Sequence, residues 1–370
     1  MSSLDPLVLD ALDTPSVLVD LARLKRNVAN FAGSARSTGV DLRPHVKTHK
    51  TVEIAELQRA AGAVGITVAK LSEAEVYVAA GFDDIFVAYP IVGEQKWRHA
   101  AELARRCRLI VGVESNFGIE GLAAAAKAAG VVIAVRVEFD SGLRRSGASV
   151  DQLAALCEEV MRNDGLELEG IFTFRSSAFP GSQGRSIAAL GKEEGELLAD
   201  VATALRDAGF PIRSVSGGST PTGLHVASVP GVTEIRPGTY VFNDLMVRAD
   251  GGCEEDALAL TILATVVSRP DESMAIIDAG SKTLAGDGEM GPSGACHHGE
   301  LVGDGGYLAW LNEEHGAVRL LNDFQPRIGE RVRVYPVHVC TVVNLASTLV
   351  VVDGDRVIDR WTVAARGCNQ

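Results

Sequence analysis

The chain has 370 residues, 46% of them hydrophobic, which is enough for a barrel-sized domain and a smaller second one. Its 35 Lys and Arg against 48 Asp and Glu give a net charge of −13, which argues against a nucleic-acid or anionic-membrane partner and favours a small molecule. It has no signal-peptide pattern, no apolar run long enough to cross a bilayer, and six cysteines without CxxC spacing, so we expect a cytoplasmic protein with reduced thiols.

The first two thirds of the sequence alternate short β-branched runs with Ala-rich amphipathic stretches. This rhythm is typical of parallel βαβ units, and eight of them predict a (β/α)8 barrel. The predicted helices include 72–80, which begins with a Ser72/Glu75 capping box, and 188–208. The eight strands are expected at 42–47, 65–70, 84–89, 108–113, 132–137, 169–174, 212–216 and 233–235.

After about residue 245 the pattern changes to strands separated by turns, without long helices. This predicts a mainly antiparallel β-domain behind the barrel. Its strands are expected at 261–267, 274–278, 330–334, 347–352 and 356–359.

A lysine flanked by two histidines, Lys47, ends the first predicted strand in the run RPHVKTHK at 43–50. Desolvation and neighbouring cations lower the pKa of a lysine, which covalent chemistry with an aldehyde requires. The run therefore points to pyridoxal phosphate (PLP) bound at Lys47. The other interpretation is a basic loop in contact with solvent, and the run alone leaves both open.

A second polar pair, His338 and Cys340, ends the run RVYPVHVC at 333–340. At spacing i, i+2 on a strand, both side chains point to one face, so an imidazole nitrogen and a thiolate can bind one metal ion. Mixed nitrogen and sulfur ligation favours zinc, and two protein ligands leave positions open, as a catalytic site requires. The alternative is an ordinary half-buried strand with a free cysteine.

Two glycine-rich turns follow the last two predicted barrel strands, where phosphate sites of such barrels are commonly built. The strand at 212–216 leads through Ser216 into Gly217 and Gly218, and the strand at 233–235 leads into RPGTY at 236–240. Glycines let backbone N–H groups approach a phosphate, and hydroxyls add donors. Their position favours phosphate binding over ordinary turns.

Six segments stand out in chain order: TPSVLVD at 14–20, RPHVKTHK at 43–50, EIRPGTYVF at 234–242, DAGSK at 278–282, EEHG at 313–316 and PVHVC at 336–340. Together they resemble the D-serine dehydratase and D-threonine aldolase family, fold-type III PLP enzymes related to alanine racemase. The resemblance covers nearly the whole chain. It implies a PLP-binding barrel at 21–244 and a β-domain made of 1–20 and 245–370 that carries the metal ligands.

The resemblance also implies roles for single residues. Lys47 would bind PLP and act as the base, and Gly217, Gly218, Gly238 and Tyr240 would contact the cofactor. The segment DSGLRRSG at 140–147 is similar to a racemase segment whose arginine hydrogen-bonds the cofactor's phenolate oxygen, and the matching residue is Arg145. A surface ion pair is the alternative for this arginine. Relatives form homodimers.

One segment departs from the family pattern. Relatives typically read Phe-x-Gly-His-Ser-Tyr after the sixth barrel strand, and this chain reads FRSSAF at 174–179. Ser177 therefore stands at the histidine position and Phe179 at the tyrosine position, which removes a donor and a proton carrier. One interpretation is that Arg175 compensates by binding a substrate carboxylate.

The function implied by the resemblance is a PLP- and zinc-dependent lyase that eliminates water, then ammonia, from D-β-hydroxy amino acids. Within the family, His-x-Cys marks the dehydratase branch and His-x-Asp the aldolase branch, so Cys340 favours a D-serine dehydratase-like activity. The alternative is a D-threonine or 3-hydroxy-D-aspartate aldolase that cleaves Cα–Cβ to glycine and an aldehyde. A non-catalytic PLP carrier is a third reading, but it has no need of His338 and Cys340. The sequence leaves D-serine, D-threonine and 3-hydroxy-D-aspartate open as substrates.

Overall fold

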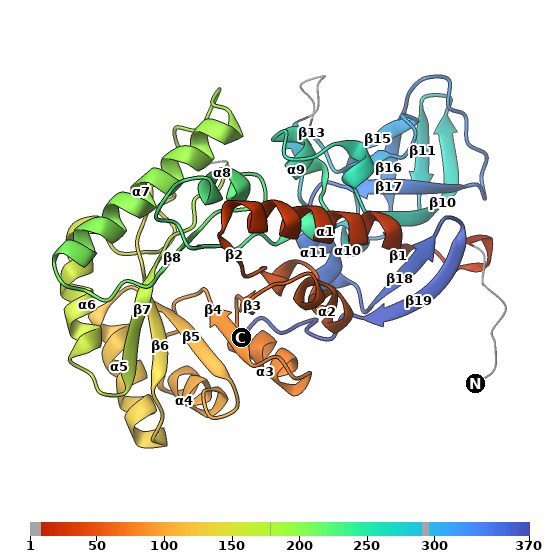
Figure 1. The fold of residues 1–370 in the computed structure, drawn as a ribbon. Helices are drawn as coiled ribbons and strands as arrows, with labels where there is room; N and C mark the ends of the chain where they lie inside the picture. Colours follow the sequence, from red (N-terminus) through yellow and green to blue (C-terminus); the bar gives the residue numbers. More distant parts are fainter. Residues whose placement is uncertain (1–8, 178, 291–295) are drawn as a thin grey trace. The chain divides into compact units, whose positions relative to one another are not determined.

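The computed structural model describes residues 9–177, 179–290 and 296–370, and the chain passes several times between two compact units (Figure 1). The barrel unit comprises the described residues of Ala29–Lys47, Ile54–Gly238 and Cys368–Gln370. The β unit comprises those of Met1–Val28, Thr48–Glu53 and Thr239–Gly367. The domain boundaries expected from the sequence, 21–244 against 1–20 with 245–370, stay a prediction.

The barrel unit contains an 8-stranded parallel sheet in the order β2-β9-β8-β7-β6-β5-β4-β3. An isolated parallel bridge between His45 and Thr67 joins the chain after β2 to β3. The sheet is therefore curled, and the predicted barrel-type fold is confirmed. Its strands are β2 (Asp41–Leu42), β3 (Ile66–Val68), β4 (Asp84–Val87), β5 (Arg108–Val113), β6 (Ile133–Glu138), β7 (Leu166–Phe172), β8 (Ser214–Gly217) and β9 (Glu234–Ile235).

The helices between these strands begin and end at recognisable caps. Ser115 accepts a hydrogen bond from Gly118 N–H at the start of α5, and Gly130 ends that helix in the left-handed conformation. Ser186 caps α7 in the same way through Ala189 N–H. The helices up to the end of the barrel are α1 (Leu21–Thr38), α2 (Val52–Ala60), α3 (Leu71–Ala79), α4 (Glu94–Leu103), α5 (Asn116–Ala129), α6 (Leu153–Met161), α7 (Ile187–Asp207) and α8 (Gly223–Ala227).

The predicted Ser72/Glu75 capping box is wrong. Helix α3 begins at Leu71, and the Glu73 carboxylate accepts the N–H groups of Ala69 and Lys70 at 2.8 and 3.2 Å. The Ser72 hydroxyl instead donates to the Gln370 carbonyl, 2.7 Å away. The box is displaced by two residues because the buried Glu73 side chain turns back onto the strand end, where its hydrogen bonds are shielded from water.

The interior of the barrel holds an ionic network toward the amino ends of the strands. Arg136 is 2% exposed and bonds Glu169 at 2.7 Å and Glu234 at 2.5 Å, and Arg43 bonds the other oxygen of Glu234 at 2.7 Å. Burial opposes ionisation, but Arg136 and Arg43 hold the pKa of Glu234 below its ordinary value. The charges are paired as buried charges must be.

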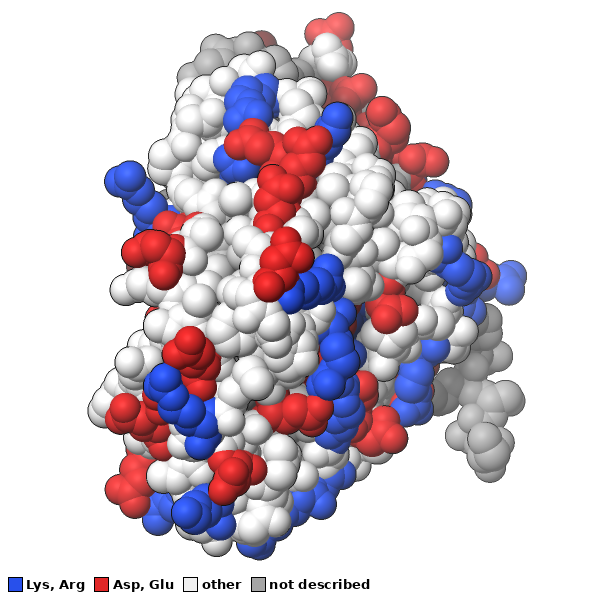
Figure 2. Space-filling view, turned by 60° about the vertical axis from the view of Figure 1, so that its left-hand side comes forward, with Lys and Arg blue, Asp and Glu red and all other residues white. Residues whose placement is uncertain are grey.

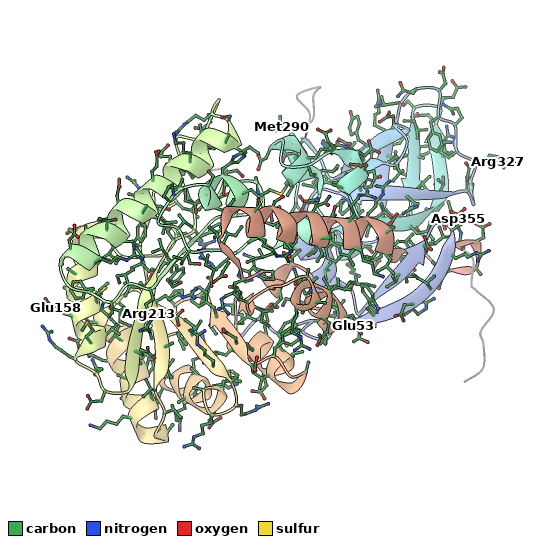
Figure 3. The ribbon with its side chains drawn as sticks, in the orientation of Figure 1. Glu53, Glu158, Arg213, Met290, Arg327 and Asp355 are labelled. Carbon is green, nitrogen blue, oxygen red and sulfur yellow. The ribbon has the colours of Figure 1, made fainter. Side chains whose placement is uncertain are left out.

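A pocket of about 340 Å³ opens among these paired groups, and Arg213, labelled in Figure 3, belongs to its lining. Arg213 pairs with Glu167, so arginines and carboxylates here balance one another. Above the network, Phe86 and Phe172 pack edge to face with ring centroids 5.0 Å apart. This apolar layer separates the network from the carboxyl ends of the strands.

The β unit contains a 9-stranded sheet in the order β11-β16-β15-β14-β17-β10-β1-β18-β19, and only the β1–β18 pairing among its neighbours is parallel in the part of the chain described. Strand β1 lies between β10 and β18, so this part of residues 1–20 joins the sheet as expected, whereas residues 1–8 lie outside the described residues. The strands are β1 (Ser16–Asp20), β10 (Leu260–Asp271), β11 (Met274–Ile277), β14 (Gly299–Leu301), β15 (Gly306–Leu311), β16 (Gly316–Leu320), β17 (Arg331–Pro336), β18 (Thr348–Asp353) and β19 (Arg356–Thr362).

Short elements complete the β unit. A 2-stranded sheet joins β12 and β13, and three short helices follow the barrel in sequence. Their bounds are β12 (Glu289–Met290), β13 (Cys296–His297), α9 (Leu245–Ala249), α10 (Ser281–Leu284) and α11 (Val339–Leu345).

Charged side chains of both signs are spread over the visible surface. On the face shown in Figure 2, acidic and basic side chains stand in small groups beside one another, with broad uncharged stretches between them. None of the helices in the described parts of the chain has the length and apolar character that a membrane span needs.

Candidate active site

A cavity of about 410 Å³ lies within the barrel unit, at the carboxyl ends of the strands. This is the end at which barrels of this type place their active sites, and the volume falls in the range of small-molecule pockets. The residues lining it follow β2, β3, β4, β5, β6, β7 and β9: His45, Lys47, Ala69, Lys70, Ala88, Tyr89, Pro90, Glu114, Glu138, Arg145, Ser146, Phe172, Phe174 and Arg236.

Lys47 lines this cavity as predicted, but it does not sit on a strand. Strand β2 ends at Leu42, and the N–H groups of Arg43 and His45 continue its pairing by donating to Ile235 and Pro237. Lys47 then lies in a 3-10 turn, Val46–Thr48, with its ammonium 5.8 Å from the centre of the Phe174 ring. The predicted strand 42–47 is therefore too long, because the chain enters this turn at Val46.

Two other lysines near Lys47 in sequence have different surroundings. Lys50 is buried in the β unit, with a positive φ of 49°, and its ammonium donates to the Ala365 carbonyl at 3.3 Å. Lys70 lines the cavity, with its ammonium 3.7 Å from the centre of the Tyr89 ring. The cavity thus presents two amines, Lys47 and Lys70.

Arg145 also lines the cavity, and its contact with the cofactor stays a prediction. Its guanidinium lies 4.8 Å from the centre of the Phe174 ring. The loop needs glycine at position 147, because φ is 102° and an added Cβ would come within 2.5 Å of the Asp140 nitrogen. Asp140 shapes the same loop by accepting the N–H groups of Gly142 and Arg144.

A buried carboxyl, Glu138, faces the same space. It is 4% exposed and accepts a hydrogen bond from the Ser146 hydroxyl at 3.0 Å. Burial raises the pKa of Glu138 to about 7, and the nearby Glu114 adds to the shift. This carboxyl therefore changes its charge near neutral pH, in contrast to an ordinary glutamate.

Sequence reasoning missed Arg236, which lines the cavity directly after β9. Its guanidinium donates to the Ser216 hydroxyl at 2.5 Å and to the Thr173 carbonyl at 2.7 Å. Burial lowers the pKa of Arg236 to about 10. Its place right after a barrel strand, inside the segment EIRPGTYVF, is the signal that could have found it.

The glycine turn after β8 is as tight as expected. An added Cβ would lie 2.4 Å from Leu198 at Gly217 and 2.8 Å from the backbone of Gly223 at Gly218, where φ is 78°. The Gly218 N–H donates to the carboxylate of buried Glu194 at 2.9 Å. That N–H, which we expected to face a phosphate, is thus engaged by a side chain.

The remaining predicted cofactor contacts stay predictions. The Ser216 hydroxyl donates to Glu234 at 2.6 Å and accepts from Arg236, inside the barrel. Gly217, Gly218 and Gly238 are not among the residues that line the cavity described above. Tyr240 is buried in the β unit.

His338 and Cys340 do not share a strand, so that part of the prediction is wrong. Strand β17 ends at Pro336, and His338 is the N-cap residue of α11, in whose first turn Cys340 lies. The helix begins here because the buried Asp244 carboxylate accepts the Val339 N–H at 3.1 Å. The sequence offered no local sign of this distant cap.

The two side chains nevertheless meet. Burial opposes protonation, but a hydrogen bond with Cys340 raises the pKa of His338 to about 9. The Cys340 thiol also donates to the hydroxyl of Thr48, the residue after Lys47, at 3.3 Å. An imidazole and a thiol in direct contact are a donor set that one zinc-like ion can bind.

The pair fits an open rather than a closed metal site. In the described residues, no three His, Cys, Asp or Glu side chains are grouped so that they could hold a metal ion together. Two protein ligands would leave coordination positions for water or substrate, as in a catalytic site.

In the segment 174–179, which departs from the family pattern, Arg175 contacts other side chains of the protein. Arg175 pairs with Glu193 at 2.9 Å and stacks on the Phe179 ring, 3.9 Å from its centre. Neither residue lines the cavity. The structure thus gives no support to a substrate carboxylate on Arg175.

Comparison with known families matches both parts of the chain. Residues 19–245 match the alanine racemase N-terminal domain, and residues 259–352 match the putative serine dehydratase domain. The chain belongs to the fold-type III PLP enzymes of the D-serine dehydratase and D-threonine aldolase family. Characterised relatives of the chain are PLP-dependent lyases.

Three family members illustrate the range. The chain is 37% identical to D-threo-3-hydroxyaspartate dehydratase of Delftia sp. (strain HT23), over 89% of this chain and 91% of that one. D-threonine aldolase from Filomicrobium marinum superposes with a TM-score of 0.90 at 31% identity, over 100% of both chains. A cysteine-to-alanine variant of D-threo-3-hydroxyaspartate dehydratase, in its metal-free form, superposes with a TM-score of 0.86 at 34% identity, over 96% and 98%.

Proposed function

We propose that this chain is a lyase, dependent on PLP and a divalent metal, that eliminates water and then ammonia from D-β-hydroxy amino acids. The observation that carries the proposal is the contact between His338 and Cys340 at the start of α11, in a chain whose barrel presents Lys47 to a cavity. The metal is zinc, since a nitrogen and a sulfur donor favour it. The metal-free form of the related dehydratase supports a metal in this branch.

The barrel residues have distinct tasks in this proposal. Lys47 binds the cofactor covalently, and bound PLP supplies the electron sink for chemistry at the substrate α-carbon. Arg145 and Arg236 offer fixed cationic donors to the cofactor, because rings and hydrogen bonds hold both guanidiniums in place. With the cofactor in place, the Lys47 amine would take the proton from the substrate α-carbon.

The metal ligands act at the other bond that breaks. His338 and Cys340 would hold the ion, whose Lewis acidity makes the substrate β-hydroxyl a better leaving group. Thr48, the chain neighbour of Lys47, contacts this pair, since its hydroxyl accepts a hydrogen bond from Cys340. The proposal keeps the expected cytoplasmic homodimer with a small D-amino acid as substrate.

The alternative function is cleavage of the Cα–Cβ bond by a D-threonine or 3-hydroxy-D-aspartate aldolase. The likeness to D-threonine aldolase from Filomicrobium marinum favours it. Cleavage requires removal of the proton on the β-hydroxyl, whereas elimination requires the C–O bond to break. Ser177 is a poor proton acceptor in place of the family's histidine, and this supports elimination.

A product assay on purified enzyme distinguishes the two reactions. We expect D-serine to give pyruvate and ammonia, D-threonine 2-oxobutyrate and ammonia, and the L-isomers no product. Glycine and acetaldehyde in equal amounts from D-threonine would identify an aldolase. No turnover of D-serine, D-threonine or 3-hydroxy-D-aspartate, with PLP still bound, would favour a carrier.

The double variant Ser177→His, Phe179→Tyr adds a test of the departing segment. If that segment sets the partition, the variant shifts D-threonine from 2-oxobutyrate toward glycine and acetaldehyde. If the metal ligands set it, the product ratio stays that of the wild type.

A further inference from the structure

Asp287 is hydrogen-bonded to the turn of the β unit that carries the two metal-ligand candidates, His338 and Cys340. Its Oδ2 accepts a hydrogen bond of 2.6 Å from the hydroxyl of Thr341, which follows Cys340 in α11. Its carbonyl oxygen lies 3.0 Å from Nδ1 of His298. Neither contact involves His338, so Asp287 keeps its place independently of that imidazole.

From this position the Asp287 carboxylate faces one particular nitrogen of His338. Oδ2 lies 3.6 Å from Nδ1. This distance is too long for a hydrogen bond, but a negative charge so close still acts strongly on the ring. It favours the tautomer with the proton on Nδ1, which leaves the lone pair on Nε2.

We propose that Asp287 is a positioning residue of the metal site, which selects the His338 tautomer whose Nε2 can bind the ion. The inference rests on the proposed function in that it takes His338 and Cys340 as the ligands. Asp287 is not itself a ligand in this proposal, because the described residues contain no group of three His, Cys, Asp or Glu side chains suited to a metal. Carboxylates that orient ligand histidines in this way typically affect metal affinity by about 10- to 100-fold.

The test measures metal binding and needs no turnover. Full-length apoprotein is titrated with Zn²⁺ in a competition assay, and Co²⁺-loaded protein is examined for its thiolate-to-metal absorption band. The variants are Asp287→Asn, Asp287→Ala, His338→Ala and Cys340→Ala. Glu289→Gln is the matched control, since it removes one negative charge two residues further along.

We expect Asp287→Asn and Asp287→Ala both to weaken Zn²⁺ binding by about 10- to 100-fold and to keep the thiolate band. Glu289→Gln should bind like the wild type. The asparagine variant is decisive, because its amide oxygen can still accept from Thr341 and so preserves the turn. A purely structural Asp287 therefore predicts wild-type affinity for Asp287→Asn, and that result would overturn the proposal.

Two further outcomes are separable from this one. If Asp287→Asn abolishes binding and the thiolate band as completely as His338→Ala does, Asp287 is a ligand and the positioning role is wrong. If the wild type binds no more Zn²⁺ than His338→Ala and Cys340→Ala, the metal part of the proposed function fails, and this inference fails with it.

Discussion

In the proposed function, the chemistry depends most on the lysine that binds the cofactor, Lys47. Lys47 and Lys70 both line the cavity, whereas the Lys50 ammonium donates to Ala365 inside the β unit. We expect Lys47→Ala to lose the visible absorption band of the lysine-bound cofactor and all turnover. Lys50→Ala should keep the band, since its amine has a structural partner.

The site of attachment can be read directly. Borohydride reduction followed by peptide mapping should place the pyridoxyl group on Lys47. Finding it on Lys70, the other amine that lines the cavity, would show that the wrong lysine has been assigned.

Loss of the metal ligands should be separable from loss of the cofactor. Removing either the His338 imidazole or the Cys340 thiol should abolish zinc retention and lower kcat by about 10²-fold or more, since Lewis-acid assistance supplies several kcal/mol. The cofactor band should persist, because neither side chain binds the ring in this proposal. Metal analysis with steady-state kinetics provides the measurement, and full activity in a chelator-treated preparation would remove the metal from the mechanism.

Two adjacent glutamates on α7 have pKa values that are shifted in opposite directions. Glu194 is fully buried and accepts the N–H of Gly218, and burial raises its pKa to about 7. Arg185 and Arg175 lower the pKa of its half-buried neighbour Glu193. One helix thus carries one carboxyl that resists ionisation and one that favours it.

For Glu194, the raised pKa means that its contribution to stability is fully present below the unfolded pKa and is lost as the pH rises through about 7. The glutamine in Glu194→Gln does not titrate. The free energy of unfolding of this variant should therefore rise relative to that of the wild type between about pH 5 and pH 8. The gain is on the order of 3 kcal/mol. Urea unfolding of the apoprotein across this range measures it.

The control runs the other way. Glu193 contributes stability above its unfolded pKa and loses it as the pH falls through the lowered folded value. Glu193→Gln should therefore be less stable than the wild type at neutral pH, and the difference should vanish in acid. The same pH trend in both variants would contradict the assignment of the two environments.

The elements with local signatures were predictable and those set by distant partners were not. All eight barrel strands were expected within a few residues of their observed starts, because buried β-branched runs mark them. The α11 start at His338 depends on Asp244, and the α3 cap depends on Glu73 turning back, and neither shows in a local pattern. Strands β14, β15 and β16 were missed, and each of them begins with a glycine, a residue that is unfavourable in strands.

The candidate site shows the same division. Lys47 and Arg145 could be predicted because family segments mark them, and both line the cavity. Arg236 is held by Ser216 and Thr173, 20 and 63 residues away, and Glu138 matters because it is buried; a local sequence pattern shows neither the contacts nor the burial. The ionic network around Arg136 was missed for that reason too, since Glu169 and Glu234 lie 33 and 98 residues away.

Each compact unit of the molecule is built from separate segments of the chain. Strand β1 allows this discontinuous construction of the β unit to be tested. Strand β1 pairs with β10 on one side and β18 on the other, so residues near the start of the chain connect two parts of a sheet made from its last third. Leu18 on β1 is fully buried, in a cluster with Leu12, Leu263, Val350 and Val352. Without that packing, β18 and β19 lose their link to the rest of the sheet.

Leu18→Ala should therefore lower the free energy of unfolding by about 2–5 kcal/mol, the usual cost of a cavity in a close-packed core. Ile358→Ala is the matched control, because Ile358 is 47% exposed on the outermost strand β19, and surface changes cost about 0.5 kcal/mol. Urea unfolding followed by near-UV circular dichroism gives both values. If the two variants lose equally little, β1 is not a central strand, and the assignment of the first residues to the β-domain is wrong. If Leu18→Ala alone is strongly destabilised, β1 packs in the core between strands that come from the last third of the chain.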